Sequence, residues 1–433
     1  MGMLICGGQL LDPAAERNGI YDILVKDGVI AELKEWKDGV APVWEDGTAE
    51  TVLDARGKFV MPGFIDLHVH LREPGLEYKE TIATGSMAAA AGGFTSVCPM
   101  PNTKPSTDTP EKIRALLEKA KTDSKIHILP IGAISIGQEG KELADIQGMV
   151  EAGAVAVSED GKSVMNSALY AEGMKLAALA GVPVFAHCED IDLVRGGVIN
   201  AGKRAEELGL PGITSAVEDI ITARDIFLAR ETGVRLHLCH CSTKDSVKMI
   251  ALAKAEGLPV SGETGPHYFT MIDEEIPEDF GNYKMNPPLR GKEDKEALIL
   301  ALQDNVLEAI ATDHAPHSKE EKEQSMLKSP FGIVGSETAY ALTVTELVRT
   351  GKISMMQLVE RMSAAPAKIL GINKGSLQVG MAADITVADA DTQWTIDPEK
   401  FFSKGKNTPF AGKKVYGKIY DTIVDGKTVF HQE

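Results

Sequence analysis

The sequence predicts an α/β fold: a (β/α)8 TIM barrel with a small β-sandwich domain built from the N- and C-terminal segments. Three observations lead to this prediction. Short apolar runs alternate with helical stretches between residues 61 and 370, eight of these runs have the character of strands, and both ends of the chain have a strand-and-turn texture. Alternating strands and helices are typical of βα units in a parallel sheet, and eight such units close into a barrel.

The barrel is predicted from residues 61–370. Helical stretches separate most of its strands, and residues 110–121 and 215–231 are the clearest, because apolar residues recur there at three- and four-residue spacing. The candidate strands are residues 64–70, 95–100, 126–131, 154–157, 182–187, 235–240, 259–263 and 307–313.

The two outer segments, residues 1–60 and 371–433, are predicted to pair as one composite small β-domain. Residues 4–11 and 22–33 are apolar or alternating, and Asp27-Gly28 is a turn signal. Strand texture returns near the C-terminus, at residues 383–388 and 415–424.

Composition narrows the class of protein. A chain of 433 residues exceeds one ordinary domain and fits a large barrel with a small appendage. The net charge of −18 repels nucleic-acid phosphates and anionic lipids, so we expect no nucleic acid and no membrane partner. No run of about 18 apolar residues and no signal peptide is recognisable. Five cysteines without small-domain spacing argue against a disulfide framework, so a cytoplasmic location is expected.

Polar residues gather at one end of the predicted strands. Six of the eight strands end at, or run into, a metal-ligating or polar residue: His68 and His70, Asn102, Glu159-Asp160, His187, His240, and Asp313-His314. In a barrel of this kind, catalytic groups come from the carboxyl ends of the strands. We therefore expect these side chains to meet at one mouth of the barrel.

The residue types point to metal chemistry. His68 and His70 are two residues apart on a strand, so their imidazoles project from the same face. Neutral imidazole is a good zinc ligand, and a carboxylate can bridge two metal ions. Four histidines and two aspartates fit a dinuclear site, and the absence of a thiolate set favours catalytic over structural zinc. The same ligands accept cobalt and manganese.

Taken singly, these signals are weak. An isolated His-x-His pair is as often structural as metal-binding, and a lone His187 after a strand is more often a satisfied polar end. His127 and His237 are interpreted as core or strand histidines. The Cys-His-Cys run at 239–241 suggests a thiolate site, but alternation along a strand would put both cysteines on the face opposite His240. The joint pattern favours the metal site.

At these residues the chain resembles the amidohydrolase superfamily and, within it, the dihydroorotases. Residues 61–70 (MPGFIDLHVH) resemble the superfamily's first barrel strand, and residues 71–75 (LREPG) resemble the narrower dihydroorotase form. The further matches, in family order, are MPNT at 100–103, DHAPH at 313–317, Phe331-Gly332, and the return into the small domain at 374–377 and 380–384. The resemblance covers essentially the whole chain.

The resemblance implies a role for each residue. His68 and His70 would bind a first zinc ion together with Asp313, His187 and His240 would bind a second, and Asp160 would bridge the two. Asp313 would also be the catalytic base and acid. Arg72, Asn102 and His317 would hold a substrate carboxylate, and Asn286 with the backbone around Phe331 and Gly332 would hold a ring amide edge. The implied substrate-binding set is His70, Arg72, Asn102, Asn286, His317, Phe331 and Gly332.

Two positions need comment. Many relatives bridge their metals with a carbamylated lysine, whereas residues 158–161 here (SEDG) resemble the branch that uses an aspartate. Lys162 is the alternative bridging residue. Residues 263–268 (ETGPHY) are as close to allantoinases and hydantoinases as to dihydroorotases, so they support the superfamily but not the substrate.

The resemblance implies a zinc-dependent dihydroorotase, which reversibly closes N-carbamoyl-L-aspartate to L-dihydroorotate in pyrimidine biosynthesis. Two alternatives are an allantoinase or hydantoinase, and a non-catalytic dihydroorotase-like scaffold for aspartate transcarbamoylase. Arg72 and Asn102 favour a carboxylate-bearing substrate, and six filled ligand positions argue against the scaffold. A homodimer is implied, and association with aspartate transcarbamoylase stays open.

Overall fold

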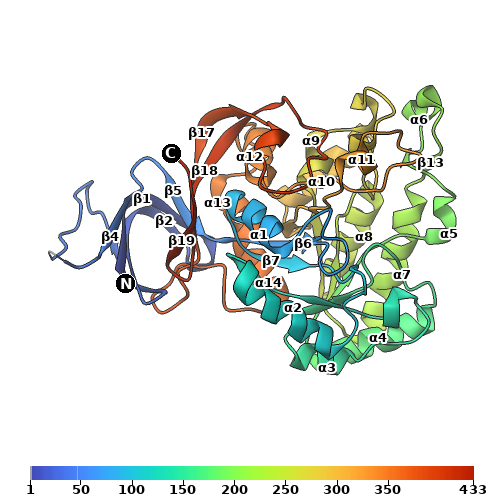
Figure 1. Ribbon diagram of the computed structural model, residues 1–433, viewed down its shortest axis with the longest axis horizontal. Helices are drawn as coiled ribbons and strands as arrows, with labels where there is room; N and C mark the ends of the chain where they lie inside the picture. Colours follow the sequence, from blue (N-terminus) through green and yellow to red (C-terminus); the bar gives the residue numbers. More distant parts are fainter. Residues whose placement is uncertain (1, 46) are drawn as a thin grey trace.

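The protein has a β-rich lobe at one end and a larger α/β part at the other in this computed structural model, which describes residues 2–45 and 47–433 (Figure 1). Both termini lie in the β-rich lobe, where strands from the start and the end of the chain run side by side. Within the described residues, none of the helices is long and apolar enough to cross a membrane.

The β-rich lobe is one hydrogen-bonded sheet of eight strands, in the order β19-β18-β17-β5-β1-β2-β3, with β4 pairing with β1. The two terminal segments join where β5 runs antiparallel to β17, with Pro62 opposite Ile385. A separate apolar cluster, including Ile5, Ile23 and Ile385, stabilises this lobe. Its strands are β1 (Gly2–Asp12), β2 (Arg17–Lys26), β3 (Val29–Glu35), β4 (Thr51–Asp54), β5 (Phe59–Pro62), β17 (Ile385–Thr395), β18 (Lys414–Val424) and β19 (Lys427–His431).

The turn predicted at Asp27-Gly28 divides residues 22–33 between two strands. Asp27 has a φ of 52° and Gly28 a φ of 82°, so both lie in the left-handed region that a tight hairpin turn requires. The hairpin pairs β2 with β3.

Nine short strands of the described α/β part form two parallel sheets, and β12 (Ile199–Asn200) and β13 (Gly212–Ile213) form a separate parallel pair. The first has the order β6-β7-β8 and the second β16-β15-β14-β11-β10-β9. An isolated parallel bridge between Val69 and His314 joins the end of β6 to the segment after β16. The strands are β6 (Phe64–Val69), β7 (Phe94–Pro99), β8 (His127–Ile128), β9 (Ile131–Ala133), β10 (Ala156–Ser158), β11 (Val184–Ala186), β14 (Leu236–Leu238), β15 (Val260–Thr264) and β16 (Ala309–Ile310).

Every predicted barrel strand overlaps an observed one, but the prediction of one continuous strand at residues 126–131 was wrong. The structure has two pieces there: β8 pairs with β7, and β9 pairs with β10. Pro130 lies between them, and proline has no N–H group to donate to a strand ladder, so the strand breaks at this point.

Helices lie around these strands (Figure 1). Helix α2 shows how the sequence begins them: Pro110 occupies the first turn, and the Thr109 side chain accepts a hydrogen bond from the Lys112 N–H. The main helices are α1 (Ile82–Ala91), α2 (Pro110–Asp123), α3 (Ile146–Glu151), α4 (Ser167–Ala180), α7 (Ala216–Thr232), α8 (Lys244–Ala255), α10 (Lys292–Gln303) and α14 (Ala365–Leu370).

The remaining elements are short. They are the α-helices α5 (Ile191–Val194), α6 (Lys203–Leu208), α9 (Pro266–Thr270), α11 (Lys319–Lys322), α12 (Ala339–Thr343) and α13 (Met355–Val359), the strands β12 (Ile199–Asn200) and β13 (Gly212–Ile213), the 3-10 turns Pro13–Ala15, Ile136–Gln138, Asp273–Glu275, Gly281–Tyr283 and Pro398–Lys400, and the π-helical turns Val344–Val348 and Glu360–Ala364.

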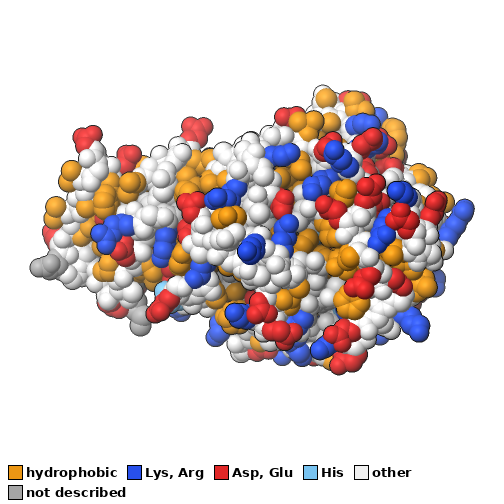
Figure 2. All heavy atoms as spheres, turned by 90° about the horizontal axis from the view of Figure 1, so that it is seen from above, with side chains coloured by type: hydrophobic (Ala, Val, Ile, Leu, Met, Phe, Trp, Pro, Cys, Tyr) orange, Lys and Arg blue, Asp and Glu red, His pale blue; other side chains and the backbone are white. Residues whose placement is uncertain are grey.

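Burial along the strands explains where function can lie. Strand residues Ile65, Leu67 and Phe185 pack in one apolar cluster with Leu370 of α14. Buried polar side chains that follow the carboxyl ends of strands include His70, Asp160, His187, His240 and Asp313. On the face seen in Figure 2, acidic and basic side chains are interspersed and do not form a field of one sign.

Candidate metal and substrate site

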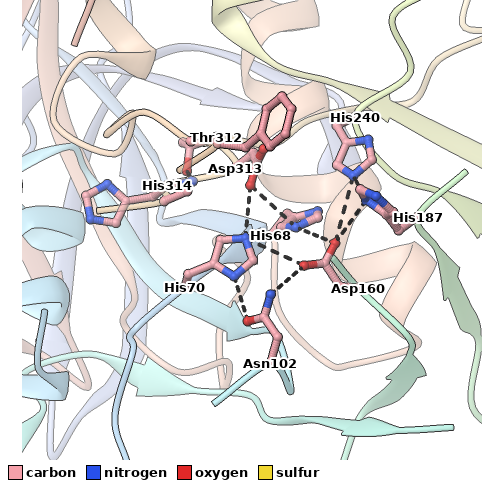
Figure 3. Close-up of polar contacts among 12 residues, drawn as sticks. His68, His70, Asn102, Asp160, His187, His240, Thr312, Asp313 and His314 are labelled. Atoms are coloured by element: carbon pink, nitrogen blue, oxygen red, sulfur yellow. Dashed lines mark hydrogen bonds and ion pairs between the residues drawn. The ribbon is translucent and has the colours of Figure 1, made fainter. Parts of the chain in front are cut away.

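The six side chains predicted as metal ligands converge in the structure (Figure 3). His68 belongs to β6 and His70 follows it, while Asp160, His187, His240 and Asp313 follow β10, β11, β14 and β16. The Nε2 atom of His70 lies 3.0 Å from Oδ1 of Asp313, and Nε2 of His68 lies 3.2 Å from Oδ1 of Asp160. All six side chains are at least nine-tenths buried as residues.

Asp160 lies at the centre of this group. Its Oδ1 atom faces three histidines, with His68 Nε2 at 3.2 Å, His187 Nδ1 at 3.5 Å and His240 Nε2 at 3.8 Å. Its Oδ2 atom faces His70 Nε2 at 3.7 Å. A carboxylate whose two oxygens face different ligand groups has the geometry needed to bridge two metal ions.

The donor atoms fit a metal better than they fit one another. The buried atoms His68 Nε2 and His240 Nδ1 have no hydrogen-bond partner among the described residues. Two sets of side chains have ligand atoms within 4.8 Å of one another: His68 with Asp160 and His240, and His68 with His70 and Asp313. Buried polar atoms without partners are costly, and a cation beside Asp160 would satisfy His68 Nε2.

The two aspartates stay ionised. Burial raises the pKa of Asp160, but the His68 imidazole and its neighbours outweigh this and hold that pKa well below its usual range. Burial also acts on Asp313, where His68 and His70 again outweigh it and lower the pKa. Ionised carboxylates are the form that binds metal ions.

The ligands have their own partners, which sequence reasoning missed. Glu263, in β15, lies 3.3 Å from His68 Nδ1 and 3.0 Å from His237 Nε2. Glu189 lies 3.1 Å from His187 Nε2. Glu263 follows the pattern of a charged residue near a strand end, so this signal was visible in the sequence. His237, interpreted as a core histidine, is fully buried but also contacts Glu263.

The predicted substrate residue Asn102 lies between two predicted metal ligands. Its Oδ1 atom is 2.9 Å from His70 Nδ1, and its Nδ2 donates to Asp160 Oδ2 at 3.1 Å (Figure 3). The amide therefore orients both groups while it also lines the cavity described next.

A cavity of about 170 Å³ opens over the ligands. The structure brings all seven predicted substrate residues to its wall, together with every predicted metal ligand except His68, which lies deeper. The lining residues are His70, Arg72, Asn102, Asp160, Gly161, His187, His240, Asn286, Asp313, Ala315, His317, Phe331 and Gly332.

Arg72 brings an uncompensated positive charge to this wall. Arg72 is 9% exposed, and its Nε donates to the Pro316 carbonyl at 3.2 Å. The guanidinium forms no ion pair with any described carboxylate. Burial lowers its pKa to about 10, so the guanidinium stays charged at neutral pH. A buried charge without a partner indicates a binding site for an anion.

The neighbouring His317 does not act as a hydrogen-bond acceptor for Arg72. Lys79 donates from Nζ to His317 Nδ1 at 3.1 Å, so the proton of a neutral ring is on Nε2, which donates to the Phe331 carbonyl at 2.8 Å. Burial and the nearby cations, Arg72 first, hold the His317 pKa far below its usual range. Arg72 Nη2, 3.3 Å from His317 Nε2, therefore faces another donor and not an acceptor.

Comparison with known proteins identifies the relatives of this site. A family model described as Dihydro-orotase-like matches residues 57–246. A dihydroorotase of Acetivibrio thermocellus is 46% identical over 432 residues, which is 100% of this chain and 99% of that protein. A dihydroorotase of Staphylococcus epidermidis is 49% identical over 382 residues, covering 88% of this chain and 90% of that protein.

The chain belongs to the dihydroorotase family.

Solved structures related to this dihydroorotase-family chain are cyclic amide hydrolases. L-hydantoinase (dihydropyrimidinase) from Arthrobacter aurescens matches with a TM-score of 0.88 at 30% identity, covering 99% of this chain and 96% of that one. A D-hydantoinase matches with a TM-score of 0.85 at 26% identity. Family and structural relatives place the chain among metal-dependent cyclic amidohydrolases, and the ligand groups described above supply the candidate metal site.

Three site residues of the dihydroorotase-family chain have a left-handed backbone. The φ angles are 60° at Arg72, 35° at His240 and 47° at Asp313. Such conformations cost on the order of 1–3 kcal/mol each in non-glycine residues and occur most often at functional sites. They redirect side chains just beyond the strand ends, which no local sequence pattern predicts.

This backbone corrects the expectation for the Cys-His-Cys run. Strand β14 ends at Leu238, so simple alternation does not extend to His240. Cys239 Sγ lies within 4.8 Å of ligand atoms in His68 and Glu263. Burial and the Glu263 carboxylate raise the pKa of the Cys239 thiol.

Lys162 and Asn286 both form hydrogen bonds near the dihydroorotase-family site. Lys162, the alternative bridging residue, donates from Nζ to the Gln138 carbonyl at 2.9 Å and does not line the cavity. Asn286 donates from Nδ2 to Glu189 Oε1 at 2.9 Å, which leaves its Oδ1 to accept from a ligand.

A segment from the β-rich lobe also holds the cavity wall. Between β17 and β18 the chain leaves the sheet, and buried Asn407 donates from Nδ2 to the carbonyls of Ala315 and Gly332, at 3.1 and 3.0 Å. Its Oδ1 accepts from the backbone N–H of His317 at 3.1 Å. Nothing in the sequence around Asn407 indicated this contact.

The backbone of Gly332 is already engaged inside the protein. Its N–H donates to the Lys284 carbonyl at 3.0 Å, and its carbonyl accepts from Lys322 Nζ at 2.8 Å and from Asn407. Gly332 lines the cavity, but its N–H is not free to donate to a ligand.

Proposed function

We propose that this chain is a dihydroorotase, which catalyses the reversible cyclisation of N-carbamoyl-L-aspartate to L-dihydroorotate in pyrimidine (UMP) biosynthesis. The observation that supports this substrate is the buried Arg72 guanidinium. It lines a small cavity beside the predicted metal ligands and has no carboxylate partner among the described residues. L-dihydroorotate and N-carbamoyl-L-aspartate both carry a carboxylate that a guanidinium binds through two hydrogen bonds.

The proposal includes two zinc ions per chain. His68, His70 and Asp313 would hold one, His187 and His240 would hold the other, and Asp160 would contact both, in keeping with the two faces of its carboxylate. When bound, such ions polarise a carbonyl and lower the pKa of water towards about 7.

Asp313 carries the proton in this scheme. In the hydrolytic direction it takes a proton from the attacking water and returns it to the ring nitrogen as the amide C–N bond breaks. In the biosynthetic direction it would take a proton from the carbamoyl NH₂ group as that nitrogen attacks the side-chain carboxyl carbon, and return it to the departing oxygen. That oxygen takes one further proton from solvent and leaves as water as the C–O bond breaks. Its lowered pKa keeps the base form available at neutral pH.

The other lining residues would orient the substrate. Arg72 and Asn102 would hold the carboxylate, and His70 would contact the substrate beside them. His317 would join them by turning its Nε2–H from the Phe331 carbonyl to the carboxylate. Asn286 Oδ1 would accept from a ring N–H, because Nδ2 is held by Glu189. The backbone around Phe331 and Gly332 would face the ring amide edge. The Gly332 N–H is already bonded to the Lys284 carbonyl, so the contact would use the second lone pair of the Phe331 carbonyl.

The proposed architecture behind the site is a closed (β/α)8 barrel of residues 61–370, with a small β-sandwich domain of residues 1–60 and 371–433. Two observations support closure: the bridge from Val69 to His314, and the continuation of the chain from β8 directly into β9. We also propose a cytoplasmic homodimer. Such a dimer could also associate with aspartate transcarbamoylase, and that partner is left open.

Hydantoinase activity is the second candidate, because the solved relatives named above are hydantoinases. One sample decides between them: metal per chain by elemental analysis, and turnover of dihydroorotate, hydantoin and allantoin. About two zinc ions with turnover of dihydroorotate alone is the expected result. Turnover of hydantoin or allantoin instead would overturn the substrate, and absence of metal and turnover after zinc addition would favour a non-catalytic scaffold.

A further inference from the structure

Glu263 is a fully buried carboxylate that contacts histidines from two neighbouring elements of the site. It lies in β15, and its Oε1 atom is 3.3 Å from Nδ1 of His68. Its Oε2 atom is 3.0 Å from Nε2 of His237, on the adjacent strand β14. Oε1 also accepts from the backbone N–H of His240 at 3.4 Å. One side chain therefore contacts two histidine rings and the backbone of a third histidine.

The hydrogen-bond roles at Glu263 follow from its chemistry. A carboxylate accepts only, so each imidazole nitrogen that faces it carries a proton. With a metal ion bound at Nε2, His68 would then be the tautomer with its proton on Nδ1 and its lone pair on Nε2. That Nε2 atom lies 3.2 Å from Asp160 Oδ1 and 3.6 Å from Asp313 Oδ1, and no hydrogen bond satisfies it.

We propose that Glu263 is a positioning residue, which holds His68 so that the Nε2 lone pair points into the metal site. The inference rests on the metal centre proposed above and extends it to a residue outside the cavity wall. His237 acts on Glu263 in turn, since it donates to the second carboxylate oxygen. His237 is itself held by Ser261, whose Oγ lies 2.9 Å from His237 Nδ1.

The test is metal affinity in Glu263→Gln. The glutamine keeps the shape, but only one of its two terminal atoms accepts, so it cannot accept from both His68 and His237. Loss of such a contact typically weakens metal binding about 10- to 100-fold. We expect this change in zinc affinity, measured by competition with a chelator, and an altered visible spectrum of the cobalt-substituted protein. KM should stay near the wild-type value while kcat falls, because Glu263 does not line the cavity.

Asp225→Asn is the matched control. Asp225 is an equally buried carboxylate in α7, paired with Arg224 at 2.8 Å, and it contacts none of the ligands. Its replacement should leave zinc affinity and the cobalt spectrum unchanged. Wild-type affinity and spectrum in Glu263→Gln would overturn the inference, even if its melting temperature fell.

A second measurement is made on the wild-type protein and does not use Glu263→Gln. Histidine ¹⁵N NMR of the zinc-loaded wild-type protein reports which ring nitrogen of His68 carries the proton, with the signal assigned through His68→Asn. A proton on Nδ1 is expected, and a proton on Nε2 would overturn the inference. A wild-type protein that binds no metal would instead overturn the metal centre itself, so the two failures are distinguishable.

Discussion

Nδ1 of His187 lies 2.8 Å from Nε2 of His240, so two imidazoles that follow neighbouring strands face each other directly. Two ring nitrogens at this distance are compatible only if one of them carries a proton, and Asp160 faces the same pair. A cation between these donors would satisfy all three groups at once.

Metal removal should therefore lower both activity and stability. Dialysis against a chelator should abolish turnover, and added zinc should restore it. Ligand binding at 100 times its Kd stabilises a folded protein by about 2.7 kcal/mol, so the melting temperature should rise measurably on zinc addition. Calorimetry of the two forms checks this. Equal melting temperatures and equal activity with and without metal would contradict the proposed site.

Asp313→Ala should abolish turnover while most of the metal stays bound. A positioned acid–base group contributes about 10²- to 10⁴-fold to rate, and five other ligands are left in place. Steady-state kinetics and elemental analysis of the same preparation test this. Asp391→Ala is the control, because that aspartate is exposed and pairs only with Arg349. Near-normal turnover in Asp313→Ala would remove the proton-transfer role.

Arg72→Lys should raise KM strongly and change kcat less. Lysine keeps the charge but loses the planar pair of donors, and hydrogen bonds to charged groups are worth about 1.5–3 kcal/mol. This corresponds to a KM increase of about 10- to 100-fold. Arg114→Lys, on the exposed side of α2, should have no effect. An unchanged KM for dihydroorotate would exclude Arg72 from the substrate site.

Asn407→Ala should raise KM although Asn407 does not line the cavity. Its amide holds the carbonyls of Ala315 and Gly332 and the N–H of His317. Unsatisfied buried groups cost about 1–3 kcal/mol, so stability should fall as well. Denaturant unfolding and kinetics test both effects. A stability loss with unchanged KM would show that the segment is structural only.

Asp225 predicts a pH dependence of stability. Burial, opposed by Arg224 and Tyr170, raises its pKa from 3.8 to about 6. Between about pH 4 and pH 6 the folded state then binds more protons than the unfolded state, so this group lowers stability as the pH rises, by about 3 kcal/mol in total. The difference between Asp225→Asn and wild type, measured by urea unfolding, should grow in favour of the variant up to pH 6 and then level off. A pH-independent difference would contradict the raised pKa.

Patterns of apolar residues along the chain predicted the barrel strands, because burial of a strand depends on the residues within it. The alternation of apolar runs and helical stretches marks buried parallel strands, and each predicted strand overlaps an observed one. The failure at residues 126–131 came from Pro130, whose missing N–H divides one strand into two. The residues placed at strand ends, from His68 to Asp313, line or adjoin one cavity because parallel strands end on the same side.

Contacts between distant segments could not be predicted in this way. His237 was interpreted as a core histidine, yet its ring contacts Glu263, which lies 26 residues away. The alternation argument for Cys239 failed because β14 ends at Leu238 and the backbone then turns left-handed at His240. Asn407 reaches Ala315 across 92 residues of chain.

The sequence by itself determined the strand order along the chain and the family, and it predicted a set of metal ligands, because hydrophobic period, residue type and motif order can be recognised along the chain. Only the tertiary structure decided which oxygen of Asp160 faces which histidine, that Glu263 contacts His68, and that Arg72 has no ion pair with a described carboxylate. Those relationships depend on how separate strands and loops meet in space, and burial then determines whether each polar group finds a partner.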